Sequence, residues 1–210
     1  METATARAWW EGRMLGFDLE STSPRPEEAR IVQYGLAWVG GDEPPVRHAA
    51  IVDPGVEIPA EAAEVHGITT ERARAEGVPI SEALEFILEQ LVSAAAGGVP
   101  AVIFNARYDL TVVDREARRL NLGVGDYLHR LRVVDPMVID KWLALQAVSS
   151  LPNTLDRVRE LLRHPAFSLE KPNKVRALIG SFTSGNPLRY HAVDGSGYEF
   201  HADPTLEKAI

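Results

Sequence analysis

Three acidic residues in the first half of the chain have the types and spacing of ligands for a divalent cation. Asp18 and Glu20 lie two residues apart at the end of a short apolar run, and residues i and i+2 of a strand project from the same face. Asp109 follows a second β-rich run and begins a helical pattern. Such carboxylates can hold Mg²⁺ or Mn²⁺ and leave positions for water and phosphate. Two ions about 3.5–4 Å apart would activate a water and stabilise the leaving oxygen of a phosphodiester.

The elements that must position these acids alternate between strands and helices. Strands are expected first, over residues 12–20, 31–39 and 48–52. A helix from Ser81 to about Gly97 follows, because its apolar residues recur at i, i+3, i+4 and i+7. The later elements are a strand over 101–104, a helix over 109–121 and a strand over 131–134. This order predicts an α/β fold with a mixed sheet flanked by helices.

After Met137 the pattern changes to helices alone. The expected helices cover 138–148, a segment capped by Asn153 or Thr154, and a segment capped by Asn173. Residues 190–201 are Gly-rich and are predicted to be irregular. We therefore predict two domains, residues 1–140 and a small all-helical segment over 141–210.

Composition excludes several other kinds of site. The 210 residues include no Cys, which removes disulfides, thiolate metal ligands and thiol nucleophiles. No run approaches the roughly 18 apolar residues needed to cross a bilayer, and residues 1–13 have no apolar signal core, so we expect a cytoplasmic protein without membrane contact. The net charge of −8 disfavours tight non-specific binding of nucleic acid. An enzyme that meets nucleic acid through bound cations remains compatible with it.

On its spacing alone, the pair of acids at 18 and 20 is more typical of two solvated or capping acids, but the surrounding sequence is specific. Three motifs follow in order: Gly16-Phe17-Asp18-Leu19-Glu20-Ser21-Thr22, His66-Gly67-Ile68-Thr69 and Asn105-Ala106-Arg107-Tyr108-Asp109. Together with Val133-Val134-Asp135-Pro136, they make residues 10–140 resemble the DEDDh family of 3′–5′ exonucleases. This family includes polymerase proofreading subunits and ribonuclease T, and has an RNase H-like fold. The resemblance implies that Asp18, Glu20 and Asp109 are three of four metal-binding acids in a two-ion Mg²⁺ or Mn²⁺ site.

The same resemblance implies a substrate-binding set: Leu19, Ser21, Thr22, His66, Asn105 and Tyr108. The first three would grip the terminal nucleotide. His66 would lie beside the 3′ end, and its alternative is a loop histidine that only caps a turn. The last two would shape the wall of the site, or serve in ordinary packing. The expected partner is a single-stranded or frayed 3′ end of DNA or RNA. Neither the choice between DNA and RNA nor the oligomeric state follows from the sequence.

The last motif of the family is missing. It is a His followed five residues later by an Asp, which supply the general base and the fourth metal-binding acid. In this chain His191 precedes Asp194 by three residues, and His201 precedes Asp203 by two. Loss of a general base costs on the order of 10²–10⁴ in rate. We therefore expect an impaired exonuclease, and the alternative is a pseudo-enzyme that binds a cation and a nucleotide without turnover.

The helical segment resembles a second family. Asp140-Lys141-Trp142-Leu143, Asn186-Pro187 and His191-Ala192-Val193-Asp194-Gly195 make residues 138–206 similar to the C-terminal helical region of bacterial aminopeptidase N. The chain lacks His-Glu-x-x-His, so zinc peptidase activity is not expected. The chain thus has the character of a chimera. Its helical part is predicted to be an interaction module retained from the aminopeptidase, or a set of amphipathic helices that cover the sheet face left open by the missing motif.

Overall fold

The computed structural model describes residues 11–123, 127–204 and 206. The chain divides into two units, Met1–Asp135 and Pro136–Ile210. The boundary that we predicted, after residue 140, falls within the first helix of the second unit. The outer ends of the two predicted domains, residues 1–10 and 207–210, lie outside the described residues.

The first unit is built on a mixed six-stranded sheet with the order β4-β3-β2-β1-β5-β6. Its strands are β1 (Met14–Ser21), β2 (Ile31–Val39), β3 (Val46–Asp53), β4 (Val78–Pro79), β5 (Ala101–Val102) and β6 (Val133–Val134). The first three form an antiparallel meander, whereas β5 runs parallel to β1 and β6 parallel to β5. The predicted α/β class, a mixed sheet flanked by helices with a helical segment after it, is confirmed.

Strand β1 separates its side chains cleanly between the two faces of the sheet. Leu15, Phe17 and Leu19 are buried on one face, and the alternate residues, Asp18 and Glu20 among them, project from the other. The acids are paired across the sheet with small or polar residues, Asp18 with Gly35 on β2 and Glu20 with Gln33. The alternation therefore places the apolar core on one side of the strand and the two candidate metal-binding acids on the other.

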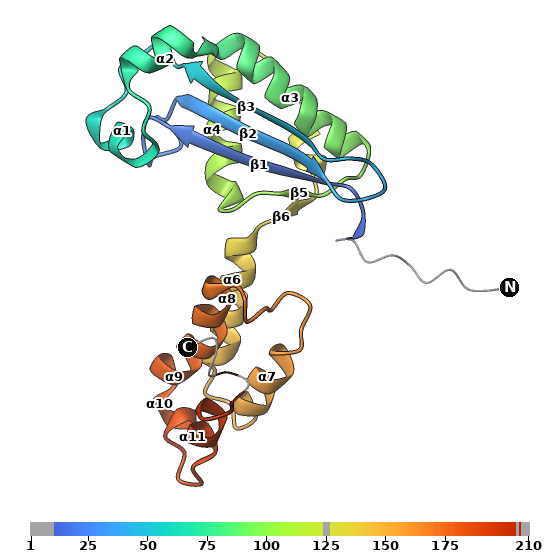
Figure 1. Cartoon of the computed structure of the whole chain (residues 1–210), viewed down its shortest axis with the longest axis vertical. Coiled ribbons are helices and arrows are strands. Elements are labelled where there is room, and N and C mark those ends of the chain that lie inside the picture. The colour runs from blue at the N-terminus through green and yellow to red at the C-terminus, as the bar shows by residue number, and fades with distance from the viewer. Residues whose placement is uncertain (1–10, 124–126, 205, 207–210) are drawn as a thin grey trace, which may run out of the picture. The chain divides into compact units, whose positions relative to one another are not determined.

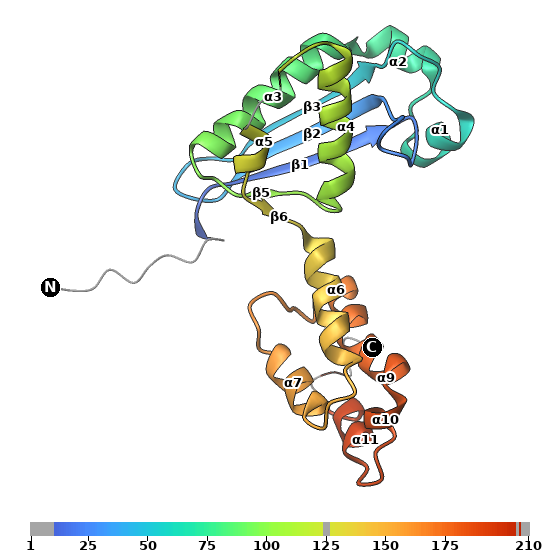
Figure 2. The ribbon, with the colours of Figure 1, turned by 180° about the vertical axis from the view of Figure 1, so that it is seen from behind.

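Two long helices cover the apolar face of the sheet, α3 (Ile80–Ala96) and α4 (Ala106–Arg119), as Figures 1 and 2 show from opposite sides. Both helices contribute to the same core as β1, through residues such as Leu84, Ile87 and Val112. Helix α4 begins three residues before the predicted start, because Asn105 adopts a left-handed conformation and turns the chain directly into the helix.

Two short helices that the sequence analysis did not predict lie beyond the end of β3. Helices α1 (Ala60–His66) and α2 (Thr70–Glu76) contribute to a small separate apolar cluster that includes Ile58 and Ile68. Helix α1 follows Pro59 and ends at Gly67, which has a φ of +75°. Another short helix, α5 (Tyr127–Arg130), precedes β6.

The second unit contains helices only. They are α6 (Pro136–Ala147), α7 (Thr154–Leu161), α8 (Pro172–Val175), a π-helical turn (Arg176–Gly180), α9 (Ser181–Gly185), α10 (Pro187–Tyr190) and α11 (Ser196–His201). Apolar side chains from these elements form a core of their own. In the described part of the chain, no helix has the length and apolarity needed to span a bilayer.

Two expectations for the second unit were wrong. The helix predicted to be capped by Asn173 begins two residues earlier than that cap implies, at Pro172, with Lys171 in the cap position. Residues 190–201 are not irregular throughout, since α11 occupies half of them. The glycine at 197 is required by packing and does not break the structure, because a Cβ there would lie 2.2 Å from the carbonyl oxygen of Tyr190.

Candidate functional site

The acid from α4 reaches the end of β1. Asp109 lies in the first turn of α4 and is only 3% exposed, and burial raises its pKa to about 7. This value of about 7 includes the effect of the negative charge of Asp18, which comes second after burial, and a smaller effect of Asp135. The backbone N–H groups of Asp109 and Leu19 act in the opposite direction. Asp18 on β1 and Asp109 on α4 thus belong to one partly desolvated site.

Asp18 lies on an open part of the sheet. The face around it is formed by Gly16, Gly35 and Ala49, which leave a shallow hollow of about 570 Å³. In Figure 1 the middle of this face is turned toward the viewer, and no described helix of the first unit lies over it. Burial among the strands still raises the pKa of Asp18, against a hydrogen bond from the Leu19 backbone.

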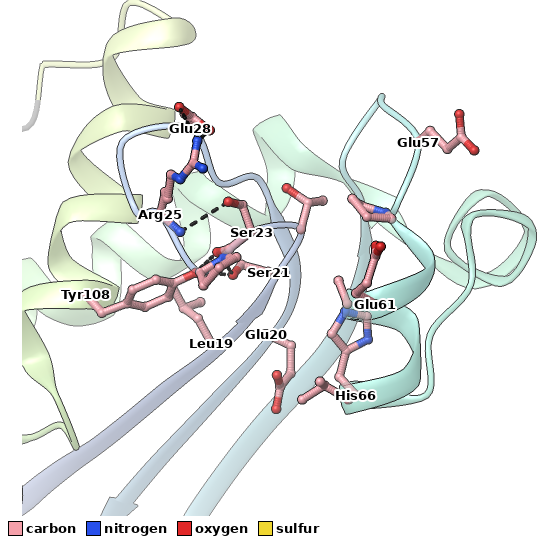
Figure 3. Close-up of a pocket in the computed structure, with 15 residues that line it drawn as sticks. Leu19, Glu20, Ser21, Ser23, Arg25, Glu28, Glu57, Glu61, His66 and Tyr108 are labelled. Carbon is pink, nitrogen blue, oxygen red and sulfur yellow. Dashed lines mark hydrogen bonds and ion pairs between the residues drawn. The ribbon is translucent and has the colours of Figure 1, made fainter.

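The three predicted metal ligands do not form a closed cluster. Among the described residues, no group of three or more Asp, Glu or His side chains is arranged to bind a metal ion as it stands. Glu20 points into the space between β1 and α1 (Figure 3). Asp18 and Asp109 nevertheless fit a divalent cation, because their oxygens are hard donors and their mutual repulsion is what a cation would relieve. The fit is therefore good for two ligands, with the third nearby.

A cavity of about 890 Å³, within the usual size range for small-molecule sites, is lined by Glu20 and by Leu19 and Tyr108, the chain neighbours of Asp18 and Asp109. The end of β1 and the following loop form one side, and α1 forms the other (Figure 3). Five of the six predicted substrate-binding residues line it: Leu19, Ser21, Thr22, His66 and Tyr108. The sixth, Asn105, lies at a separate shallow hollow. The structure thus brings most of the predicted set together.

The Tyr108 hydroxyl is fixed at the edge of this cavity. It donates to the carbonyl oxygen of Ser23 and is hydrogen-bonded to the Ser21 hydroxyl. Burial raises the pKa of Tyr108, and the charges of Asp109 and Glu20 raise it further, although the bond to Ser21 lowers it. The phenol therefore stays protonated at neutral pH and serves as a hydrogen-bonding group.

His66 has one engaged and one free ring nitrogen. Its Nδ1 accepts a hydrogen bond from the Ile68 backbone N–H at 3.2 Å, which caps the turn after α1. Its Nε2 is buried and has no hydrogen-bond partner among the described residues. In the neutral imidazole the hydrogen must therefore lie on Nε2, since Nδ1 is an acceptor. His66 caps a turn, as its alternative interpretation proposed, and its ring also lines the cavity, with Nε2 itself buried.

Asp135 has a role that the sequence analysis missed. Its two carboxylate oxygens accept the backbone N–H groups of Asn105 and Ala106, both at 3.0 Å. These bonds hold the first residues of α4 against the end of β6, and so fix where Asp109 begins. An Asp-Pro pair directly after a β-rich run was the available signal, because acids often accept the free N–H groups at a helix start.

The histidines of the helical unit belong to an aromatic cluster. His191 Nδ1 is hydrogen-bonded to the Tyr198 hydroxyl at 2.5 Å, and its ring lies against Tyr190. His201 packs against the same Tyr190 ring, and its Nδ1 is buried without a partner in the part of the chain that the structure describes.

Comparison with solved structures identifies the fold. The chain is similar to a product-bound structure of exonuclease I, with a TM-score of 0.55, 16% identity, and coverage of 91% of this chain and 46% of that chain. It has an exonuclease I-like fold. Two Escherichia coli exonuclease I structures are similar at 17% identity: a zinc ion-bound complex with ssDNA (TM-score 0.53, 81% and 42% covered) and a complex with a dT13 oligonucleotide (TM-score 0.52, 95% and 46% covered). This chain therefore spans about half the length of those enzymes.

Sequence comparison identifies the helical segment. Aminopeptidase N of E. coli K12 is 52% identical over 64 residues, and aminopeptidase N of Caulobacter vibrioides is 42% identical over 79 residues. These matches cover 30% and 38% of this chain but only 7% and 9% of the aminopeptidases. A family model described as "Domain of unknown function (DUF3458_C) ARM repeats" matches residues 110–207. The C-terminal segment is thus aminopeptidase N-like, and the family match already begins inside α4.

Proposed function

We propose that the first unit binds the 3′ end of single-stranded nucleic acid and hydrolyses its terminal phosphodiester slowly. The observation that carries the proposal is the electrostatic pairing of Asp18 with Asp109 beside a cavity lined by five predicted substrate-binding residues. The exonuclease I-like fold supports a nuclease, and complexes of exonuclease I with ssDNA support a single-stranded DNA substrate. RNA and frayed ends, and a cytoplasmic location, stay predictions.

The acids would hold the cation that such chemistry needs. Asp18 and Asp109 are the first two ligands and Glu20 is the third, with Mg²⁺ or Mn²⁺ as the ions that suit carboxylate oxygens. A bound pair of ions would supply an activated water and charge stabilisation at the leaving oxygen. Asp109 must release its proton to act as a ligand, and with a pKa of about 7 it does so readily near neutral pH.

The cavity residues would position the terminal nucleotide. His66 would donate from Nε2 to an acceptor atom of the nucleotide, because its other nitrogen is occupied by Ile68. For the same reason His66 is a poor general base, since accepting a proton would require Nε2 to lose its hydrogen first. With His66 unsuited to this role, we expect a rate about 10²–10⁴ below that of an exonuclease with a His base.

The test uses a 3′-labelled single strand of DNA with Mn²⁺. The full chain should release 3′-terminal mononucleotides slowly, and Asp18→Ala should reduce the rate at least 100-fold. Glu85→Ala is a matched control, because Glu85 is an exposed acid on α3. It should keep the parent rate. Equal rates for Asp18→Ala and the unmodified chain would rule out the site formed by Asp18, Glu20 and Asp109 as the active site.

A pseudo-enzyme is the second candidate, and the unclosed cluster of acids favours it. Such a protein would bind Mn²⁺ and a deoxynucleoside 5′-monophosphate without forming products. Titration calorimetry with each ligand would distinguish the two candidates, because binding without turnover is its signature. Failure to bind either ligand would exclude both. A third candidate, an interaction fragment of aminopeptidase N without peptidase activity, is supported by the identity to that enzyme over the helical segment.

A further inference from the structure

The loop over residues 22–30 forms one wall of the cavity and has little regular structure of its own. Its two ends are joined as a narrow neck, where the Thr22 N–H donates to the Arg30 carbonyl oxygen and the Arg30 N–H donates to Thr22 Oγ1, both at 3.0 Å. At its tip, the N–H groups of Glu28 and Ala29 donate to the Arg25 carbonyl oxygen. These few bonds order the loop internally but do not fix it against the sheet.

Helix α4 holds this loop at two points. Tyr108, in the first turn of the helix, bonds to Ser21 and Ser23 at the start of the loop. Arg119, in the last turn, donates from Nη1 to the Ala29 carbonyl oxygen at 2.8 Å and from Nη2 to the Glu27 carbonyl oxygen at 3.0 Å. The two contacts are about 16 Å apart along the helix, at about 1.5 Å per residue. The loop is therefore held at both ends by one rigid element.

A buried carboxylate completes the second point. Glu116 is fully buried, and its Oε1 accepts from Arg30 Nε at 2.7 Å and from the Ile31 backbone N–H at 3.3 Å. The same oxygen lies 3.4 Å from Arg119 Nη1. Glu116 thus connects the arginine of the helix with the arginine at the exit of the loop. Both guanidinium groups lie at Oε1, whereas Oε2 is buried with no hydrogen-bond partner among the described residues.

We propose that Arg119 and Glu116 are positioning residues that keep the loop 22–30 in place as the wall of the nucleotide cavity. The loop carries Arg25, the one arginine in a lining that otherwise includes four glutamates. Holding the loop in place positions the Arg25 guanidinium toward the phosphate of a bound strand. This role of Arg25 rests on the proposed function. Since α4 also carries Asp109, the same helix positions both this acid and the wall of the cavity.

The experiment measures hydrogen exchange of the loop amides in the full chain. Arg119→Gln removes both bonds to the loop carbonyls, and we expect exchange over residues 23–29 to become at least tenfold faster, with α3 unchanged. Arg118→Gln is the matched control, because Arg118 is the neighbouring residue and pairs with Asp114 on its own helix at 2.8 Å. Arg119→Lys keeps the charge beside Glu116 but not the bidentate hydrogen bonding to the loop carbonyls. It should therefore give an intermediate rate of hydrogen exchange.

Binding of a fluorescent oligothymidylate in Mn²⁺ provides the second measurement. Arg119→Gln should weaken binding at least fivefold, and Arg118→Gln should not. A loop as well protected in Arg119→Gln as in the parent would overturn the proposal, as would faster exchange with unchanged affinity. Equal loss of protection in the loop and in α3 would also overturn it, because that pattern means general destabilisation. If the parent chain does not bind the oligonucleotide, the proposed function fails, while the exchange rates still decide whether α4 holds the loop.

Discussion

Replacing Asp109 by Asn should stabilise the cation-free protein above neutral pH, although it removes a proposed metal ligand. The carboxyl has a pKa of about 7 in the folded protein, against an ordinary value of 3.8, mainly because it is buried and secondarily because Asp18 is close. An asparagine has nearly the same shape as a protonated aspartic acid but never acquires the charge. The substitution therefore removes the cost of a buried anion.

The sign follows from which state releases the proton first. Between pH 4 and pH 7 the unfolded chain has lost this proton while the folded protein still holds it, so the free energy of unfolding falls as pH rises. The loss is complete above the folded pKa. The difference between 3.8 and about 7 corresponds to on the order of 4 kcal/mol. Relaxation of the polar groups around the buried charge reduces this figure, and we expect about 2 kcal/mol.

The assay is urea unfolding in EDTA at pH 4, 6 and 8. The stability advantage of Asp109→Asn over the parent should grow from near zero at pH 4 to about 2 kcal/mol at pH 8. The exposed-acid control Glu85→Gln should show no such trend. Mn²⁺ at pH 8 should then raise the unfolding midpoint of the parent but not of Asp109→Asn, because ligands stabilise only a state that binds them.

Two results would refute this reasoning in different ways. An advantage of the same size at pH 4 and pH 8 would mean that the carboxyl is not held protonated by burial. Equal stabilisation of the parent and Asp109→Asn by Mn²⁺ would mean that the cation binds without this residue. The second result would leave the buried acid in place but remove it from the proposed metal site.

Three further substitutions test other parts of the structure. His66→Ala should weaken binding of a deoxynucleoside 5′-monophosphate about tenfold through loss of one hydrogen bond; a fall in turnover of more than 100-fold at saturating substrate would instead mark a general base. Tyr108→Phe should speed hydrogen exchange at the start of the loop 22–30 several-fold, and unchanged exchange would show that its hydroxyl contacts hold nothing. Gly197→Ala should destabilise the chain by about 1–3 kcal/mol because its Cβ would meet the Tyr190 backbone, whereas Gly180→Ala meets nothing closer than 4.0 Å and should cost little in urea unfolding.

The strands that carry the acids were predictable because their signal is local. In β1 the apolar and polar residues alternate without a break, and the run at β2 ended where the structure ends it. The start of α4 was not predictable in the same way, since it depends on the left-handed Asn105 and on bonds to Asp135, which lies 30 residues away along the chain. Long-range capping of this kind leaves no periodic pattern in the helix itself.

The sequence predicted most of the residues that line the cavity, but it did not predict the helix that forms its second wall. Its second wall is α1, a helix with no buried residue, so it has none of the apolar periodicity by which helices are recognised. Pro59 before it and Gly67 after it were the only local signals. Likewise the contacts of Arg119 and Glu116 with the loop join residues more than 80 positions apart, and an isolated Glu and Arg on a helix are ordinarily solvated.

The composition of the open sheet face explains how the first unit can fold with no described helix of that unit over this side (Figure 1). Three of the four large apolar side chains of β1, Leu15, Phe17 and Leu19, are buried on the face that α3 and α4 cover, and only Met14 at the start of the strand alternates to the other face. The opposite face presents Gly16 and Gly35 beside Asp18, which offer little apolar area to a covering helix. If the base and fourth acid that the resemblance to DEDDh exonucleases implies belong to a helix on that side, its absence would forfeit little hydrophobic stabilisation. Such a loss costs catalysis far more than stability, so a well-folded first unit is no evidence of full activity.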